Sequence, residues 1–156
     1  MIQRIQTVFL ALSVLAWLLV LLLPIAVFGI GGESFPYVVS KFTPQSGPLA
    51  EAIEGMNGVL LFLLAIFALA LTIFSIANYK KRMTQIKFGK INLIMHLVFI
   101  VIAFFFIDGI NKALDPESFS YGIAMVLPLV SVILQVLASR AIANDEKMVR
   151  AADRIR

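Results

Sequence analysis

Polar side chains inside long apolar runs are the first candidates for chemistry in this sequence. His96, the only histidine, stands in the apolar run of residues 91–110, and Asn92 precedes it by four residues. Residues four apart share one face of a helix, so the two side chains would act together. A histidine inside a membrane can relay protons or bind a metal. The alternative, which we expect here, is a hydrogen bond between helices that holds a bundle together.

Two further polar side chains lie in the apolar runs. Asp108 is near the end of the same run, and Lys112 follows four residues later, at the spacing of a simple ion pair. Gln135 lies deep in the last run, where an interhelical contact is the expected role. If the protein were instead a small transporter or channel, His96, Asp108 and Gln135 would be the residues that line its path.

Residue types for catalysis are scarce. The chain has no cysteine, which excludes thiol catalysis, thiolate metal sites and disulfides. It has no pair of His and Glu residues at the helical spacing of a metal site. A membrane hydrolase needs clustered acid–base groups, and the carboxylates Glu33, Glu51 and Glu54 have no partner base. We therefore predict that the protein is not an enzyme and that it uses no metal and no cofactor.

The composition indicates which elements must position these residues. Hydrophobic residues make up 61% of the 156 residues and charged residues only 14%, which excludes a soluble enzyme and a disordered chain. Four apolar runs, residues 5–30, 56–79, 91–110 and 121–143, are each long enough to cross a membrane as a helix. Helices are expected because backbone groups find no hydrogen-bond partner in lipid. The sequence predicts one all-α membrane domain, residues 1–156, with a four-transmembrane-helix bundle.

The first run has an alternative interpretation as a cleaved signal peptide. Its apolar stretch is longer than the roughly 7–15 residues of a signal core, so we expect a permanent span. Pro24 and Pro128 lie inside predicted spans, where each could kink its helix. In the outer loop, residues 31–55, we expect a short strand or an interfacial segment over residues 35–39 and a short helix over residues 48–54.

The charges are divided between the two sides that four spans define. Eleven of the 13 Lys and Arg residues fall in the N-terminal segment, in residues 80–90 and from Arg140 onward, whereas only Lys41 and Lys112 fall on the other side. Cytoplasmic segments carry the excess of Lys and Arg, so both termini should be cytoplasmic. The predicted location is the inner (cytoplasmic) membrane, as a multi-pass protein.

The cytoplasmic side also carries the candidate interaction surface. A juxtamembrane cluster such as residues 80–90 attracts anionic lipid headgroups, and we expect no specific nucleic acid. The tail, residues 144–156, has no Pro or Gly, and Glu146 and Arg150 are spaced to stabilise a helix. We predict an amphipathic cytoplasmic helix that lies on lipid or docks on a protein partner. The candidate partner- or lipid-binding residues are Lys80, Lys81, Arg82, Lys87, Lys90, Arg140, Lys147, Arg150, Arg154 and Arg156.

The two ends of the chain resemble a known family. The opening segment Met-Ile-Gln-Arg-Ile-Gln-Thr (residues 1–7), the Gln-Ile-Lys stretch at residues 85–87 and the closing residues 140–156 are similar to a bacterial four-span inner-membrane family catalogued as domain of unknown function 4293. The resemblance covers the chain from end to end. It implies an inner-membrane location and four helices, and it implies no established activity or site residues.

These observations favour a non-enzymatic accessory or scaffolding subunit of a larger envelope complex. It would dock through its basic cytoplasmic loop and tail onto another membrane or cytoplasmic protein. A small transporter or channel is the alternative, and a membrane enzyme acting on lipid or peptide is a weaker one. The sequence leaves the partner and the oligomeric state open.

Overall fold

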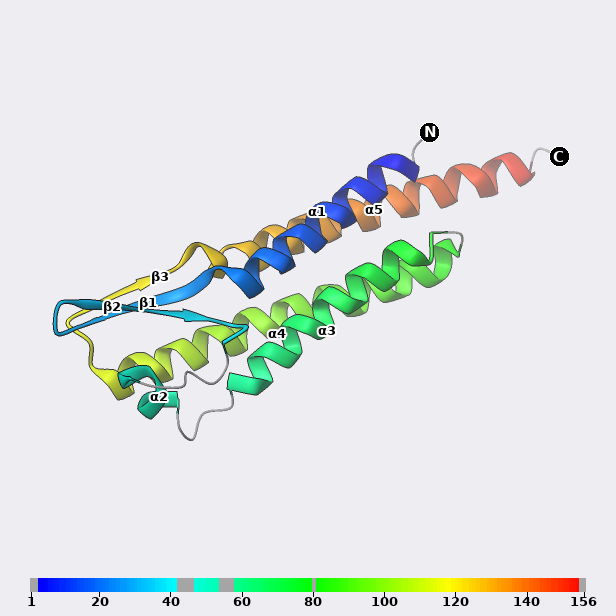
Figure 1. Ribbon diagram of the computed structural model, residues 1–156. Coiled ribbons are helices and arrows are strands. Elements are labelled where there is room, and N and C mark those ends of the chain that lie inside the picture. The colour runs from blue at the N-terminus through cyan, green and yellow to red at the C-terminus, as the bar shows by residue number, and fades with distance from the viewer. Residues whose placement is uncertain (1–2, 42–46, 54–57, 80, 155–156) are drawn as a thin grey trace.

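Four long helices and a small sheet at one end form the fold (Figure 1). The computed structural model describes residues 3–41, 47–53, 58–79 and 81–154. The long helices are α1 (Gln3–Leu22), α3 (Gly58–Ala77), α4 (Arg82–Leu114) and α5 (Leu127–Arg154). Each is long and apolar enough to cross a membrane, which confirms the prediction of a multi-pass helical membrane protein.

The long helices close a ring. α1 packs against α3 and α5, and α4 packs against the same two helices. Both chain termini and the short α3–α4 connection lie at one end of the bundle, which we call the termini end (Figure 1). The three strands lie toward the opposite end, which we call the sheet end.

Helix α3 buries mostly small residues and exposes large ones. The buried residues of α3 follow one stripe at spacings of three and four, namely Gly58, Leu61, Ala65, Ala68, Thr72 and Ser75. Large side chains such as Leu63, Phe67 and Phe74 are exposed instead. Small residues let helices approach closely, and large apolar side chains suit a lipid surround. This distribution is therefore that of a bundle packed for a membrane.

The sheet consists of β1 (Pro24–Ile30), β2 (Glu33–Val38) and β3 (Ser118–Tyr121), in the order β2-β1-β3 with antiparallel pairing throughout. Gly31 and Gly32 connect β1 to β2 and have φ angles of +60° and +80°. A two-residue hairpin turn of type I′ needs positive φ at both central positions, which glycine adopts without strain. The two glycines therefore favour a tight hairpin turn between β1 and β2.

The predicted first span was wrong over residues 23–30. The helix ends at Leu22, and Pro24–Ile30 forms the central strand. Pro24 begins that strand, where its missing N–H is tolerated, and Pro128 is the second residue of α5, where the N–H has no helical partner either. The expectation that both prolines lie inside spanning helices was therefore wrong, because each lies at the start of its element. The predicted strand near residues 35–39 lies largely in β2, and the predicted short helix is α2 (Pro48–Ile53).

The segment 80–90, expected as a loop, is mostly helix. α4 begins at Arg82 and has 33 residues, a length of about 50 Å, which exceeds the roughly 30 Å of a bilayer core. Gly89 is the only strong helix breaker between residues 82 and 90, so little opposes an early start. The tail through Arg154 likewise continues α5 without a break.

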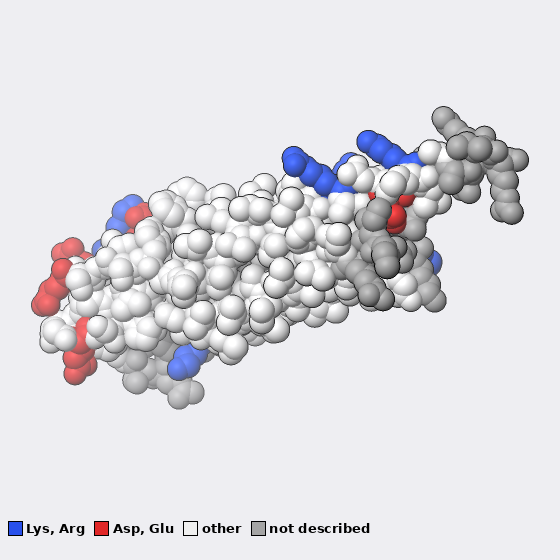
Figure 2. All heavy atoms as spheres, turned by 90° about the horizontal axis from the view of Figure 1, so that it is seen from above, with Lys and Arg blue, Asp and Glu red and all other residues white. Residues whose placement is uncertain are grey.

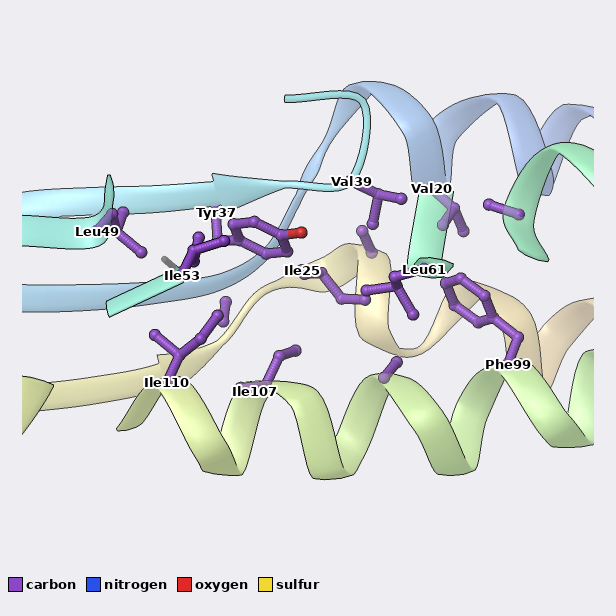
Figure 3. Packing of buried hydrophobic residues seen from close by; sticks show 14 of the residues in the cluster. Val20, Ile25, Tyr37, Val39, Leu49, Ile53, Leu61, Phe99, Ile107 and Ile110 are labelled. Atoms are coloured by element: carbon purple, nitrogen blue, oxygen red, sulfur yellow. The ribbon is translucent and has the colours of Figure 1, made fainter. Parts of the chain in front are cut away.

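At the sheet end, an apolar core joins the sheet to α4 (Figure 3). Ile25 and Tyr37 face Ile107 and Ile110 of α4, and all four are buried. The Tyr37 ring lies 5.5 Å from the Phe106 ring, between centroids. Burial of this apolar surface holds the sheet against the C-terminal part of α4.

Candidate functional site

His96 is completely buried and hydrogen-bonded on both ring nitrogens. Trp17 Nε1 of α1 donates to His96 Nε2 over 2.7 Å, and the two rings meet edge to face with centroids 5.0 Å apart. Because Nε2 accepts this bond, the ring proton must be on Nδ1, which donates to the backbone oxygen of Asn92. The geometry therefore holds a neutral imidazole in one tautomer.

Asn92, on the same face of α4 as His96, links α4 to α3 and to α5. Its Nδ2 donates to Thr72 Oγ1 of α3 over 2.8 Å and to Gln135 Oε1 of α5 over 3.2 Å. Thr72 Oγ1 in turn donates to the Ala68 oxygen over 2.8 Å. Together with the Trp17–His96 bond, these contacts connect all four long helices. We call the five side chains of Trp17, Thr72, Asn92, His96 and Gln135 the polar centre.

Asp108 lies outside the polar centre. Lys112 Nζ is 2.7 Å from Asp108 Oδ2. The Lys112 side chain is 75% exposed and the Asp108 side chain is 38% exposed. Twelve residues of helix, about 18 Å, separate Asp108 from His96. The structure thus brings Asn92, His96 and Gln135 together and places Asp108 in the ion pair expected at its spacing.

The sequence interpretation missed Trp17 and Thr72 as members of the polar centre. Trp17 is 79 residues from His96, so no local spacing joins them. A usable signal was the recurrence of polar residues at helical spacing, since Ser13 precedes Trp17 by four residues and Thr72 precedes Ser75 by three. Gly89 also belongs here, because an added Cβ would lie 3.0 Å from Gln135 Nε2 and 3.1 Å from Ser139 Oγ. Its lack of a side chain lets α4 approach α5 beside the centre.

The basic residues gather at the termini end. The described side chains of Lys81, Lys87, Lys90, Arg140 and Lys147 are all exposed. Figure 2 shows Lys and Arg side chains toward the termini end, with a smaller acidic group there, and a larger group of Asp and Glu side chains at the sheet end together with a few basic ones. Arg82 lies at the first position of α4, and Arg150 and Arg154 lie in α5. Lys80 and Arg156 are outside the described residues.

Within the described parts of the chain, no group of three or more His, Cys, Asp and Glu residues is placed to hold a metal ion. The polar centre instead consists of neutral hydrogen-bonding groups. It can stabilise the bundle and offer polar contacts inside the membrane.

A family model described as Domain of unknown function (DUF4293) matches residues 2–155. Searches of curated proteins and of solved structures give no match.

Proposed function

Since the chain belongs to the family described as Domain of unknown function (DUF4293), we propose that it is a non-enzymatic accessory or scaffolding subunit of a larger envelope complex. We place it in the bacterial inner membrane with both termini in the cytoplasm. The charge distribution supports this orientation, because Lys and Arg gather at the termini end and cytoplasmic segments carry such an excess.

The observation that carries the proposal is that α5 extends beyond the start of α4 at the termini end. Gly89 of α4 lies beside Ser139 of α5. α4 begins seven residues before Gly89, so its first residue lies at about the level of Glu146 on the antiparallel α5. The last eight residues of α5, Lys147–Arg154, therefore extend about 12 Å past the start of α4.

The projecting end of α5 fits a protein partner better than a lipid surface. It continues the helix without a bend and so leads away from the bundle instead of lying across the membrane surface (Figure 1). It exposes Met148 and Val149, which are 50% and 39% accessible, beside Lys147. An apolar strip flanked by positive charge is suited to a groove with acidic margins.

The basic residues nearer the bundle are placed for lipid headgroups. Lys87 and Lys90 of α4 and Arg140 of α5 are exposed within a few residues of the Gly89–Ser139 contact. This level is close to the end of α3, because Gln85 Nε2 donates to the Ser75 oxygen there. Positive side chains at a membrane boundary attract anionic headgroups.

Replacing Lys87, Lys90 and Arg140 together with Gln should reduce the preference for anionic phospholipid. Each removed charge should weaken that preference by about 1 kcal/mol. Native mass spectrometry of the protein from mixed anionic and zwitterionic lipid micelles would measure it as the fraction of bound anionic lipid. The matched control replaces Lys41 and Lys112, at the sheet end, with Gln. Equal loss in both variants, or no loss in the first, would contradict a lipid-binding role for these three residues.

A transporter path across the bundle has less support. Of the three residues expected to line it, Asp108 is ion-paired at the surface and lies far from His96 along α4. Beyond His96 toward the sheet end, the buried residues of α4 are Phe99, Ala103, Ile107 and Ile110, which offer no polar side chain to a solute.

A further inference from the structure

Among the described residues, every buried polar residue of the four long helices lies at the level of His96 or between it and the termini end, where apolar residues such as Leu10, Ala138 and Ile142 are buried as well. Toward the sheet end, the fully buried residues include Leu61 and Phe99, which Figure 3 labels, and Ala65 and Ala103. From His96 to the termini end, buried polar side chains come from every long helix. They are Gln6, Ser13, Thr72, Ser75, Gln85, Asn92, His96, Ser131 and Gln135.

Several of these buried groups have no hydrogen-bond partner among the described residues. The atoms are Gln6 Nε2, Ser13 Oγ, Ser75 Oγ, Asn92 Oδ1, Ser131 Oγ and Gln135 Nε2. An unpaired polar group in an apolar surround costs several kcal/mol, and lipid supplies no partner. The set mixes donors, acceptors and hydroxyls, and water is the ligand that can satisfy all three kinds.

These six unpartnered atoms are distributed along the bundle axis up to the level of His96, and two others, Tyr37 Oη and Asn111 Oδ1, lie at the sheet end. Gln135 is bonded to Asn92, so Ser131, one turn earlier on the antiparallel α5, lies near the level of His96. Ser13 lies one turn before Trp17 and so near the level of Asn92. Ser75 contacts Gln85, closer to the termini end. Polar groups thus recur about every turn from the termini end to mid-depth.

We propose that the termini half of the bundle is a hydrated crevice that ends at the Trp17–His96 pair, and that His96 Nε2 is a proton-binding site reached from the termini end alone. Trp17 and Phe99 meet edge to face with centroids 4.9 Å apart, and both are completely buried. In this proposal, these two rings and the completely buried Leu61 and Val20 close the crevice toward the sheet end.

Proton uptake at His96 follows from its bonding. A hydronium ion in the crevice gives its proton to the Nε2 lone pair, an N–H bond forms, and a water molecule remains. The hydrogen bond from Trp17 Nε1 to His96 Nε2 must then break, because both nitrogens of an imidazolium carry a proton and act as donors. The Nδ1–H bond to the Asn92 oxygen is retained. Protonation is therefore coupled to release of the Trp17 indole.

No ionisable group is at hand to neutralise the imidazolium among the described residues. α1 presents Trp17 and Ser13 at this level, and α3 presents Thr72. α5 presents Ser131 and Gln135, while His96 has Asn92 and Phe99 as neighbours on its own face of α4. The unpartnered oxygens near this level, Asn92 Oδ1 and Ser131 Oγ, are neutral.

Fluorescence of the single tryptophan tests the proposal directly. The full chain is reconstituted in vesicles, trypsin cleavage of the tail reports its orientation, and the pH is changed on each side separately. Trp17 emission should fall when the termini side is acidified, since imidazolium quenches a neighbouring indole, and should not respond to the sheet side. His96→Gln keeps an acceptor for Trp17 and should abolish the response. An emission that stays constant, or that follows the sheet side, would overturn the proposal.

Cysteine accessibility tests the crevice without relying on proton binding. The chain has no cysteine, so single substitutions report cleanly. Ser75→Cys and Ser131→Cys should react with a small water-soluble thiol reagent on the order of tenfold faster than Ala65→Cys and Ala103→Cys, because only a hydrated thiol ionises readily. All four positions are buried to a similar degree, and elution profiles would check folding. Equal rates in the two pairs would overturn the hydrated crevice.

Discussion

Replacing Trp17 with Ala should lower the free energy of unfolding by about 3–5 kcal/mol, the range for removing a buried large aromatic side chain. Trp17 is completely buried, and its ring contacts both His96 and Phe99 edge to face. The substitution leaves a cavity at the junction of the polar and apolar halves. It also removes the donor to His96 Nε2, the contact that joins α1 to the polar centre.

Thermal unfolding in detergent, followed by circular dichroism, would measure this loss. Trp17→Phe separates the two contributions, because it keeps most of the ring and removes the N–H. It should cost about 0.5–1.5 kcal/mol, the net contribution of one hydrogen bond, because water in the proposed crevice can donate to Nε2 in place of the indole. Leu18→Ala, the adjacent residue with a side chain 42% exposed, is the matched control and should change stability by less than about 1 kcal/mol. A Trp17→Ala loss no larger than that of the control would show that the polar centre does not hold the bundle together.

Replacing Gly122 with Ala should disrupt the junction between the sheet and α5. A Cβ at this position would lie 2.0 Å from the Pro24 backbone oxygen and 2.7 Å from its carbonyl carbon. The Gly122 N–H also donates to the Ile25 oxygen over 2.9 Å. Its φ of −77° suits any residue, so the expected effect comes from space alone. Because both clashing atoms are backbone, the strands must move, at a cost of about 1–3 kcal/mol or more.

The same unfolding measurement applies to Gly122→Ala, with limited proteolysis to detect loosening of the sheet end. Ser120→Ala, two residues earlier on an exposed position of β3, should be close to neutral. If both variants unfold alike, the close approach of Gly122 to Pro24 does not contribute to the stability of the fold.

The long apolar helices could be predicted from sequence because hydrocarbon thickness sets their length and lipid requires helices. The central strand could not be recognised in the same way. Its residues, Pro24–Ile30, are as apolar as the helix before them, so composition gives no boundary. The strand exists because Glu33–Val38 and Ser118–Tyr121 pair with it on both sides, and the second of these contacts spans most of the chain. Pro24 and the Gly31–Gly32 turn were the local signals available.

The polar centre was predictable in part. Asn92, His96 and Gln135 stand out as polar residues in apolar runs, and an interhelical role follows from the cost of leaving them unpaired. Their partners, Trp17 and Thr72, depend on which helices are neighbours, and that order is set by packing between distant segments. The confinement of the buried polar residues to one side of His96 likewise emerges only when the buried faces of four helices are aligned.

The proposal of an accessory subunit is tested most directly by purification from native membranes in mild detergent, comparing the full chain with one that ends at Glu146 and so lacks only the projecting end of α5. Native mass spectrometry would give the identity and stoichiometry of everything retained. We expect a stoichiometric protein partner on the full chain and its loss from the truncated chain, since the projecting end of α5 begins beyond the bundle. A single species from the full chain, or a partner retained equally after truncation, would contradict docking through this helix.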